Sequence, residues 1–201
     1  MKLITISGVD GSGKSTQRQL LESTLLQRGK SVLVFHVIEF SLANRLQRSW
    51  QKGQGQDTTG TGKTQSSWWG ILFRKLFLFI DLLRFRLYLK KVSPHYDYLL
   101  SDRYFYDTLV NIAFLAKEER VHSSLEKLIP RPDCAFYFNV EPEIVMQRER
   151  IPEQGRDYLI VKKKLFEQTP LSSYFVPISA GKPLEEVFQL VSAALQERSL
   201  L

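Results

Sequence analysis

LITISGVDGSGKSTQ, residues 3–17, places a short apolar strand directly before a glycine-rich turn. The turn fits the phosphate-binding spacing G-x-x-x-x-G-K-[ST] in full, at Gly8, Gly13, Lys14 and Ser15. Glycines let backbone N–H groups turn inward around phosphates, and the helix predicted from Ser15 directs its positive dipole end at the same anion. This stretch therefore predicts a P-loop between a strand and a helix.

The loop predicts a site for the phosphates of ATP together with Mg²⁺. Lys14 would carry a point charge to the β and γ phosphate oxygens, and the Ser15 hydroxyl would ligate Mg²⁺. A chance match in a glycine-rich turn is the alternative, but the flanking strand and helix favour the functional interpretation. The residues predicted to bind ATP here are Gly8, Val9, Asp10, Gly11, Ser12, Gly13, Lys14, Ser15 and Thr16.

Strands and helices alternate along the rest of the chain. Further strands are predicted at 31–37, 96–101, 133–140 and 174–178, and a last amphipathic helix at 184–195. Helical crossovers belong to parallel sheets. With 201 residues, 43% of them hydrophobic, the chain has material for one core. We expect a single α/β domain over residues 1–201, with the P-loop NTPase fold and a five-stranded parallel sheet flanked by helices.

Two stretches depart from this alternation. Residues 51–67 hold Gly, Gln, Thr and Ser without a large apolar side chain, which predicts a flexible loop. Residues 68–89 are strongly apolar but contain five charged side chains, whereas a membrane-spanning helix needs about 20 mostly apolar residues. We predict no transmembrane segment and interpret 68–89 as a buried helix with a basic edge. A helix lying on a membrane surface is the alternative.

Charge and cysteine content narrow the class of partner and the compartment. A formal net charge of +7 favours anionic partners, which include nucleotides, nucleic acid and acidic membranes. We find no interleaved basic and aromatic motif typical of nucleic-acid binding, so no nucleic-acid partner is predicted. Cys134 is the only cysteine and excludes an internal disulfide, which favours a reducing compartment and a cytoplasmic location.

Asp102 and Arg103 follow the strand predicted at 96–101, at the carboxyl end where open parallel sheets bind their ligands. Asp102 would hold the hydration shell of Mg²⁺, and Arg103 would offer a planar fork to a second phosphate. The alternative is an ion pair at the strand end. The two residues favour a kinase over a nucleotide-dependent switch, because a switch has no acceptor phosphate to bind.

Three arginines follow the strand predicted at 133–140. A short lid that closes over transferring phosphates would have this composition, and we place it at about 148–158. A solvated basic helix end is the alternative. The arginines are Arg148, Arg150 and Arg156.

With these motifs, the sequence resembles the thymidylate kinase family of nucleoside monophosphate kinases. The resemblance covers the chain except for about residues 40–75. Four segments carry it: GVDGSGKST at 8–16, SDRY at 101–104, RPDCAFYFNVEPEIVMQRER at 131–150 and ISAGKPLEEVFQLV at 178–191.

The resemblance implies roles on the donor and acceptor sides. Lys14 and Ser15 would hold ATP and Mg²⁺, with Asp102 supporting the metal. Arg103 would bind the acceptor phosphate. Asp10 would lie near the sugar hydroxyl of the acceptor.

The resemblance also implies a role for the lid. Arg148 would lie near the adenine. Family members without an arginine in the P-loop carry the catalytic arginine in the lid, and Gly11 occupies that P-loop position here. Arg150 and Arg156 are the candidates, with Arg156 favoured because it follows Gly155.

The acceptor half departs from the family pattern. Ile38 stands where an Arg-Glu-Pro-Gly segment would place its arginine, and Leu82 stands where the base-reading arginine is expected. Ile112 stands near an expected amide, and Asn111 would restore a hydrogen-bonding partner there. Arg45 would replace the first arginine, and Arg84 or Arg86 the second.

We therefore expect phosphoryl transfer from ATP to a phosphorylated small molecule, with dTMP giving dTDP as the default reaction. A kinase of the same fold with a non-thymidine or non-nucleotide acceptor is the alternative, and a non-catalytic nucleotide-binding protein is a third. The family also implies a homodimer, in which an apolar face within 68–89 would pair.

Overall fold

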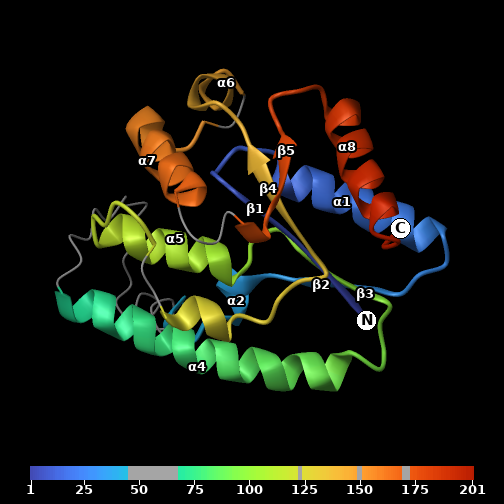
Figure 1. Ribbon diagram of the computed structural model, residues 1–201, viewed down its shortest axis with the longest axis horizontal. Coiled ribbons are helices and arrows are strands. Elements are labelled where there is room, and N and C mark those ends of the chain that lie inside the picture. The colour runs from blue at the N-terminus through green and yellow to red at the C-terminus, as the bar shows by residue number, and fades with distance from the viewer. Residues whose placement is uncertain (45–67, 122–123, 149–150, 169–172) are drawn as a thin grey trace, which may run out of the picture.

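The computed structural model describes residues 1–44, 68–121, 124–148, 151–168 and 173–201 (Figure 1). Three sequence predictions lie outside these residues: the loop at 51–67, Arg45 and Arg150.

Five parallel strands form one sheet: β1 (Lys2–Gly8), β2 (Val32–Phe35), β3 (Tyr98–Ser101), β4 (Cys134–Asn139) and β5 (Val176–Ser179). Their order is β2-β3-β1-β4-β5, and every neighbouring pair is parallel. The expected α/β architecture is confirmed. Because β1 is central and β3 is its neighbour, the turns that follow these two strands meet at one edge of the sheet.

The strands alternate between two cores, as a period of two residues requires. In β1, Leu3 faces one hydrophobic cluster, whereas Ile4 and Ile6 face the other. In β3, Leu99 and Leu100 divide in the same way. Both faces of the sheet are therefore buried, which explains why its strands read as nearly continuous apolar runs.

Helices cover both faces (Figure 1). On one face, α1 (Lys14–Gln27) and α8 (Leu184–Glu197) supply buried side chains to the cluster that contains Ile4. On the other, α4 (Trp68–Val92) and α5 (Phe105–Leu115) pack on the cluster that contains Leu3.

Shorter elements complete the chain. The 3₁₀ turn η1 (Ser124–Leu128) contacts α4, and α6 (Pro142–Met146) begins with proline in its first turn, as the sequence predicts. Helix α7 (Gly155–Glu167) contacts both α5 and α6. Figure 1 shows α6 and α7 beside the end toward which β4 points, so they lie at the carboxyl edge of the sheet.

The strand predicted at 31–37 is too long. The backbone turns at His36, and the next residues form the single-turn helix α2 (Val37–Phe40). Val37 is buried at the start of this helix, and the Phe40 ring packs 5.3 Å from the ring of Phe35. A short apolar run does not distinguish a strand from a buried helical turn, which is why the prediction failed here.

The interpretation of 68–89 as a buried helix is only half correct. Its buried face comprises Leu78, Asp81, Leu82 and Phe85. The rest of α4 carries large apolar side chains that are exposed, which we call the α4 stripe: Trp68, Trp69, Leu72, Phe73, Leu76, Phe79, Leu83 and Leu87. Among the described residues, no helix has both the length and the apolar character needed to cross a membrane.

The fold predicts that replacing either of two leucines on α1 by alanine lowers the free energy of unfolding by different amounts. Leu21 is 0% exposed and Leu26 is 53% exposed. We expect Leu21→Ala to lower the free energy of unfolding by about 2–5 kcal/mol, because it leaves a cavity under the sheet. The matched variant Leu26→Ala should change it by less than about 0.5 kcal/mol. Urea denaturation measures both, and equal costs would contradict the packing described here.

Candidate active site

The P-loop closes tightly around its own lysine. A Cβ added at Gly8, where φ is +146°, would lie 2.8 Å from the carbonyl oxygen of Phe138, so only glycine fits. Lys14 Nζ donates to the carbonyl oxygens of Gly8 at 2.9 Å and Val9 at 2.6 Å. The ammonium is thereby fixed inside the loop, where the motif predicts phosphate oxygens.

Burial dominates the electrostatics of Lys14. The side chain is buried, and this lowers its pKa from 10.5 to about 8. The carboxylates of Asp107 and Asp10 oppose the shift, while Arg103 adds to it. A cation with so little solvent around it interacts strongly with any anion that enters the loop.

The Asp107 carboxyl supports the P-loop by hydrogen bonds to the residues at its entry. Its Oδ2 accepts a hydrogen bond from Ser7 Oγ at 2.6 Å and one from the Tyr104 backbone N–H at 3.0 Å. Its Oδ1 accepts from the Gly8 N–H at 3.4 Å. Burial raises the pKa of Asp107, and the nearby Lys14 ammonium acts against that rise. This one carboxyl joins the end of β1 to the start of α5.

Ser15 and Asp102, the two residues that the sequence predicts for a Mg²⁺ site, lie next to each other. The Ser15 side chain hydrogen-bonds to the Asp102 carboxylate. His36 Nδ1 lies 3.1 Å from Asp102 Oδ1, and Arg18 Nε lies 3.7 Å from Oδ2. Burial alone would raise the pKa of Asp102. The Ser15 hydrogen bond and the charges of His36 and Arg18 outweigh burial and lower it.

This donor set fits Mg²⁺ rather than a metal held entirely by protein. A hydroxyl and one ionised carboxylate are hard oxygen ligands, and Mg²⁺ is usually bound by one or two carboxylates plus substrate phosphates. In the described part of the chain, no three side chains of the His, Cys, Asp and Glu types gather at one point.

Asp10 connects three elements. Its Oδ1 accepts a hydrogen bond from Arg103 at 2.6 Å, and its Oδ2 accepts one from the Tyr158 hydroxyl on α7 at 2.6 Å. Burial would raise the pKa of Asp10, but the charges of Arg103 and Lys162 and the Tyr158 hydrogen bond lower it. Arg103 is therefore in an ion pair at the strand end, and its side chain remains 42% exposed.

Arg148 lies across the far side of the P-loop. Its guanidinium donates to the Gly11 carbonyl oxygen and, at 2.8 Å, to that of Ala180. It lines a pocket of about 180 Å³ between the loop and the start of α8, with Ser12, Gly13, Thr16, Gln17, Ala180, Lys182, Leu184 and Val187. The predicted ATP-binding residues Ser12, Gly13 and Thr16 thus share a pocket with Arg148.

Arg156 lies in a different environment. Its Nε donates to Glu143 Oε1 at 2.9 Å, and the side chain is 57% exposed. The hydrogen bond from Arg156 lowers the pKa of Glu143. The guanidinium thus joins the start of α7 to α6 at the surface.

The residues at the positions expected to read the base are buried, and a candidate replacement is held by other hydrogen bonds. Leu82 is 1% exposed and Ile112 is 4% exposed, so both belong to the core. Arg84 donates to Asp81 at 2.6 Å and to the Phe40 carbonyl oxygen at 3.2 Å. Its role here is to join α4 to α2.

The two other candidate replacements are Arg86 and Asn111. Arg86 donates to the carbonyl oxygen of Leu128 at 2.9 Å, away from the P-loop. Asn111 is half-buried on α5, one turn after Asp107. Of the residues that the sequence suggests for reading a base, Asn111 alone lies on the helix that begins beside the P-loop.

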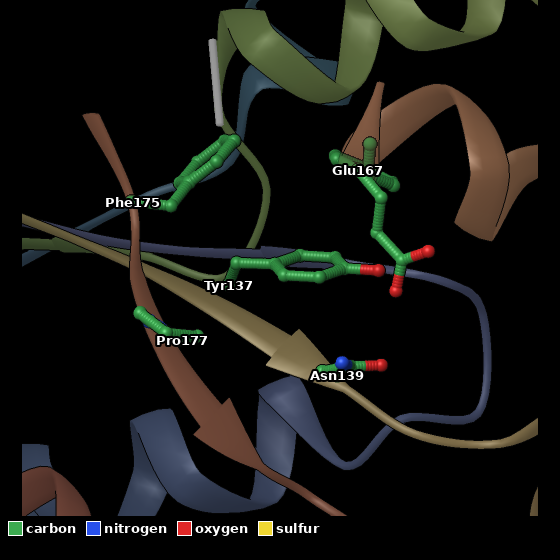
Figure 2. Close-up of a pocket in the computed structure, with 6 residues that line it drawn as sticks. Tyr137, Asn139, Glu167, Phe175 and Pro177 are labelled. Atoms are coloured by element: carbon green, nitrogen blue, oxygen red, sulfur yellow. The ribbon is translucent and has the colours of Figure 1, made fainter. Parts of the chain in front are cut away.

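A second pocket lies away from these groups. It measures about 240 Å³ at the β4–β5 edge and is lined by Tyr137, Asn139, Phe166, Glu167, Phe175 and Pro177 (Figure 2). It is larger than the pocket beside the P-loop, yet it contains no residue predicted for the site. Most of its lining is aromatic or apolar, and Figure 2 shows the Glu167 carboxylate near the Tyr137 hydroxyl end.

Sequence reasoning missed three residues of the site: Asp107 as a support of the P-loop, and Tyr158 and Lys162 on α7. Tyr158 and Lys162 are four residues apart, so they share one helix face. That spacing was the available signal. It was hidden because Lys162 opens a run of three lysines that is typical of a solvated surface.

Comparisons with known proteins agree on one family. A family model described as thymidylate kinase matches residues 6–191. A probable thymidylate kinase of Archaeoglobus fulgidus is 24% identical over 201 residues, covering 96% of this chain and 94% of the relative. A second, from Metallosphaera sedula, is 25% identical over 168 residues, covering 83% and 75%.

One solved structure extends the comparison to the fold. A thymidylate kinase from Candida albicans matches with a TM-score of 0.63 and 15% identity, over 99% of this chain and 92% of that one. At that identity the match concerns architecture alone. It confirms the expected P-loop NTPase fold.

The low pKa of Lys14 predicts a pH effect on ATP binding. The free ammonium loses its proton above about pH 8, whereas phosphate oxygens in contact with it would raise its pKa again. We expect affinity for Mg-ATP to fall by up to about tenfold per pH unit above pH 8, with proton uptake on binding. Calorimetry at pH 8.5 in buffers of different ionisation enthalpy measures that uptake.

The matched variant for this experiment is Lys14→Met, which keeps the length of the side chain and removes its charge. Its proton uptake on binding Mg-ATP should vanish at pH 8.5. Uptake that persists in Lys14→Met would assign the titration to another group.

Proposed function

The chain belongs to the thymidylate kinase family, and we propose that it transfers the γ-phosphoryl group of ATP to dTMP, giving dTDP and ADP. It is a nucleoside monophosphate kinase. The observation that carries the proposal is the meeting of two loops, the P-loop after β1 and Asp102-Arg103 after β3. The ion pair between Asp10 and Arg103, at 2.6 Å, joins them.

On the donor side, we assign the β and γ phosphates of ATP to the P-loop N–H groups and to Lys14. The hydrogen-bonded pair of Ser15 and Asp102 supports a Mg²⁺ site beside those phosphates. Mg²⁺, when bound, supplies charge neutralisation between the β and γ oxygens. Arg148 is assigned to the adenine, which the pocket beside Gly13 supports.

On the acceptor side, we assign the phosphate of the mononucleotide to Arg103. Its guanidinium is partly exposed at the carboxyl end of β3, where its planar fork can donate hydrogen bonds to two phosphate oxygens. Asp10 is assigned to the sugar hydroxyl, following the family. One Asp10 oxygen already orients Arg103, so these two roles depend on each other.

The transfer then needs positioning more than covalent chemistry. The P-loop and Arg103 hold two anions in line, and the cations around them offset the repulsion between donor and acceptor. A lid that excludes water prevents hydrolysis of ATP. Arg156 and Arg150 stay predictions for lid residues; Arg156 would first have to leave Glu143.

The acceptor pocket supports broad specificity toward pyrimidines. The expected base-reading positions are buried at Leu82 and Ile112, and Arg84 is held by Asp81. A pocket without hydrogen-bonding groups that distinguish thymine must discriminate by the methyl group, which is worth about 1–3 kcal/mol. A mononucleotide acceptor other than dTMP is therefore the second candidate.

The acceptor is tested by comparing catalytic efficiency for dTMP, dUMP and dCMP under saturating Mg-ATP. We expect phosphorylation of dTMP, with the other two within roughly 100-fold of it. Lys14→Ala is the control, because losing this charge should cost about 3 kcal/mol or more in rate. A preference for dTMP well above 100-fold would reveal a thymine site built from other residues, and inactivity with all three would refute the proposed reaction.

We also propose a homodimer formed through the α4 stripe. Large contiguous apolar patches on a protein surface mark interaction sites. The opposite face of the same helix packs on the core, so the stripe is held as a rigid surface. A second copy of the chain is the occupant that family membership favours.

The stripe predicts how association responds to charge. Phe73, which is 55% exposed, lies within it, so Phe73→Glu should convert a dimer into a monomer by placing a carboxylate in an apolar contact. Leu26→Glu changes an exposed leucine on α1, outside the stripe, and should leave the dimer intact. Sedimentation equilibrium measures both, and a wild-type monomer at all accessible concentrations would contradict the proposal.

A cytoplasmic location and the treatment of residues 1–201 as one domain also stay proposals. The cysteine argument for a reducing compartment is supported by Cys134, which is free and buried in β4.

A further inference from the structure

Lys162 lies on the face of α7 that is turned toward the P-loop. Its Nζ is 4.7 Å from the ring centroid of Tyr158, one helical turn earlier. The Tyr158 hydroxyl donates to Asp10 at 2.6 Å, and Asp10 belongs to the P-loop. Lys162 therefore contacts Tyr158, whose hydroxyl is hydrogen-bonded to a residue of the P-loop.

The neighbouring lysines face elsewhere. Lys163 forms ion pairs with Glu141 at 2.5 Å and with Glu167 at 3.8 Å. Lys164 is exposed near the end of the helix. In the described part of the chain, no carboxylate lies within ion-pair distance of Lys162.

The charges near Lys162 are those of the site. Burial lowers the pKa of Lys162, the carboxylates of Asp10 and Asp107 oppose that shift, and Arg103 adds to it. Lys162 in turn contributes to lowering the pKa of Lys14. Three cations from separate elements thus lower the pKa of the same carboxyl, that of Asp10: Lys14 from the P-loop, Arg103 from the turn after β3, and Lys162 from α7.

Lys162 is half-buried, and a partly desolvated cation without an ion-pair partner is costly unless an anion completes its environment. The anions that the proposed function brings to this point are the γ-phosphoryl group of ATP and the acceptor phosphate. A phosphate oxygen beside Lys162 would raise its pKa and keep the ammonium charged during the reaction.

We propose that Lys162 is a catalytic residue whose ammonium binds the oxygens of the transferring phosphoryl group. In the transfer, the bond from the γ-phosphorus to the β–γ bridging oxygen breaks, and a bond from that phosphorus to an acceptor phosphate oxygen forms. Lys162 exchanges no proton in this step. It neutralises charge from the α7 side, where the P-loop, with Gly11, has no arginine to do so.

This inference rests on the proposed function and differs from the lid arginines predicted from the sequence. Arg156 is paired with Glu143 at the surface, whereas Lys162 contacts the Tyr158 ring and has no ion-pair partner among the described residues. No rearrangement of an ion pair is needed before Lys162 meets a phosphate.

The test compares Lys162→Met with the matched control Lys164→Met, which removes the same charge from the exposed part of the same helix. We expect Lys162→Met to lower kcat by about 10²–10³-fold, with each KM within about threefold of wild type, because the contact strengthens in the transition state. Lys162→Arg should restore about tenfold or more of that loss, since it keeps the charge. Lys164→Met should match wild type within about twofold.

Several results would overturn the assignment. One is a kcat for Lys162→Met within about threefold of wild type; another is a rise in KM alone. Equal losses in Lys162→Met and Lys162→Arg, together with a lowered melting temperature, would indicate a structural role. A collapse of kcat confined to Arg156→Ala would assign the lid cation to Arg156 instead.

A binding measurement separates this inference from the proposed function. If wild type phosphorylates no mononucleotide, the proposed function fails while Lys162 can still be tested with Mg-ADP and fluoroaluminate, a mimic of the transferring phosphoryl group. Lys162→Met should then weaken binding of Mg-ADP with fluoroaluminate more than binding of Mg-ADP alone. Equal weakening of both, or none, would refute a contact with the phosphoryl group.

Discussion

The arrangement of the site depends on the half-buried carboxyl of Asp107. It accepts hydrogen bonds from the Ser7 hydroxyl, the Gly8 N–H and the Tyr104 N–H, so one side chain fixes the end of β1, the entry to the P-loop and the start of α5. Burying a carboxylate is costly unless it is hydrogen-bonded and near a cation. Both conditions hold here, because Lys14 lies close by. The donor loop and the Asp102-Arg103 turn therefore keep a fixed relation to each other.

The two halves of the site differ in how they are built. On the donor side, backbone geometry dominates: Gly8 has no room for a Cβ, and Lys14 is held by carbonyl oxygens. On the acceptor side, side chains that could read a base are committed to packing. Arg84 is an instance, since Asp81 and the Phe40 carbonyl oxygen hold its guanidinium between α4 and α2. The proposed donor half is thus held by the backbone of the P-loop, whereas the side chains considered for the acceptor half pack within the protein.

The sequence was sufficient to predict features that depend on the spacing of residues near one another in the chain. The P-loop, the order of strands and helices, and the meeting of Ser15 with Asp102 all follow from spacing and from the edge at which parallel strands end. Features set by tertiary packing were not accessible. Val37 was predicted to be in a strand but is the first residue of a helical turn. The α4 stripe was predicted to be buried, because an apolar residue type does not by itself show whether the side chain is exposed. Lys162 was hidden because only the rotation of α7 distinguishes it from the two lysines that follow.

The desolvated lysines have a consequence for the energetics of the whole protein. Between its folded pKa of about 8 and 10.5, Lys14 holds its proton less firmly in the folded chain than in the unfolded one, so the unfolded state binds more protons and stability from this group rises with pH. At neutral pH Lys14 is protonated in the folded protein, although burial disfavours its positive charge. An anion that binds the native state relieves that cost and also stabilises the fold by mass action. Occupancy of the site and stability of the fold are in this way linked, so a nucleotide that binds the native state raises the free energy of unfolding.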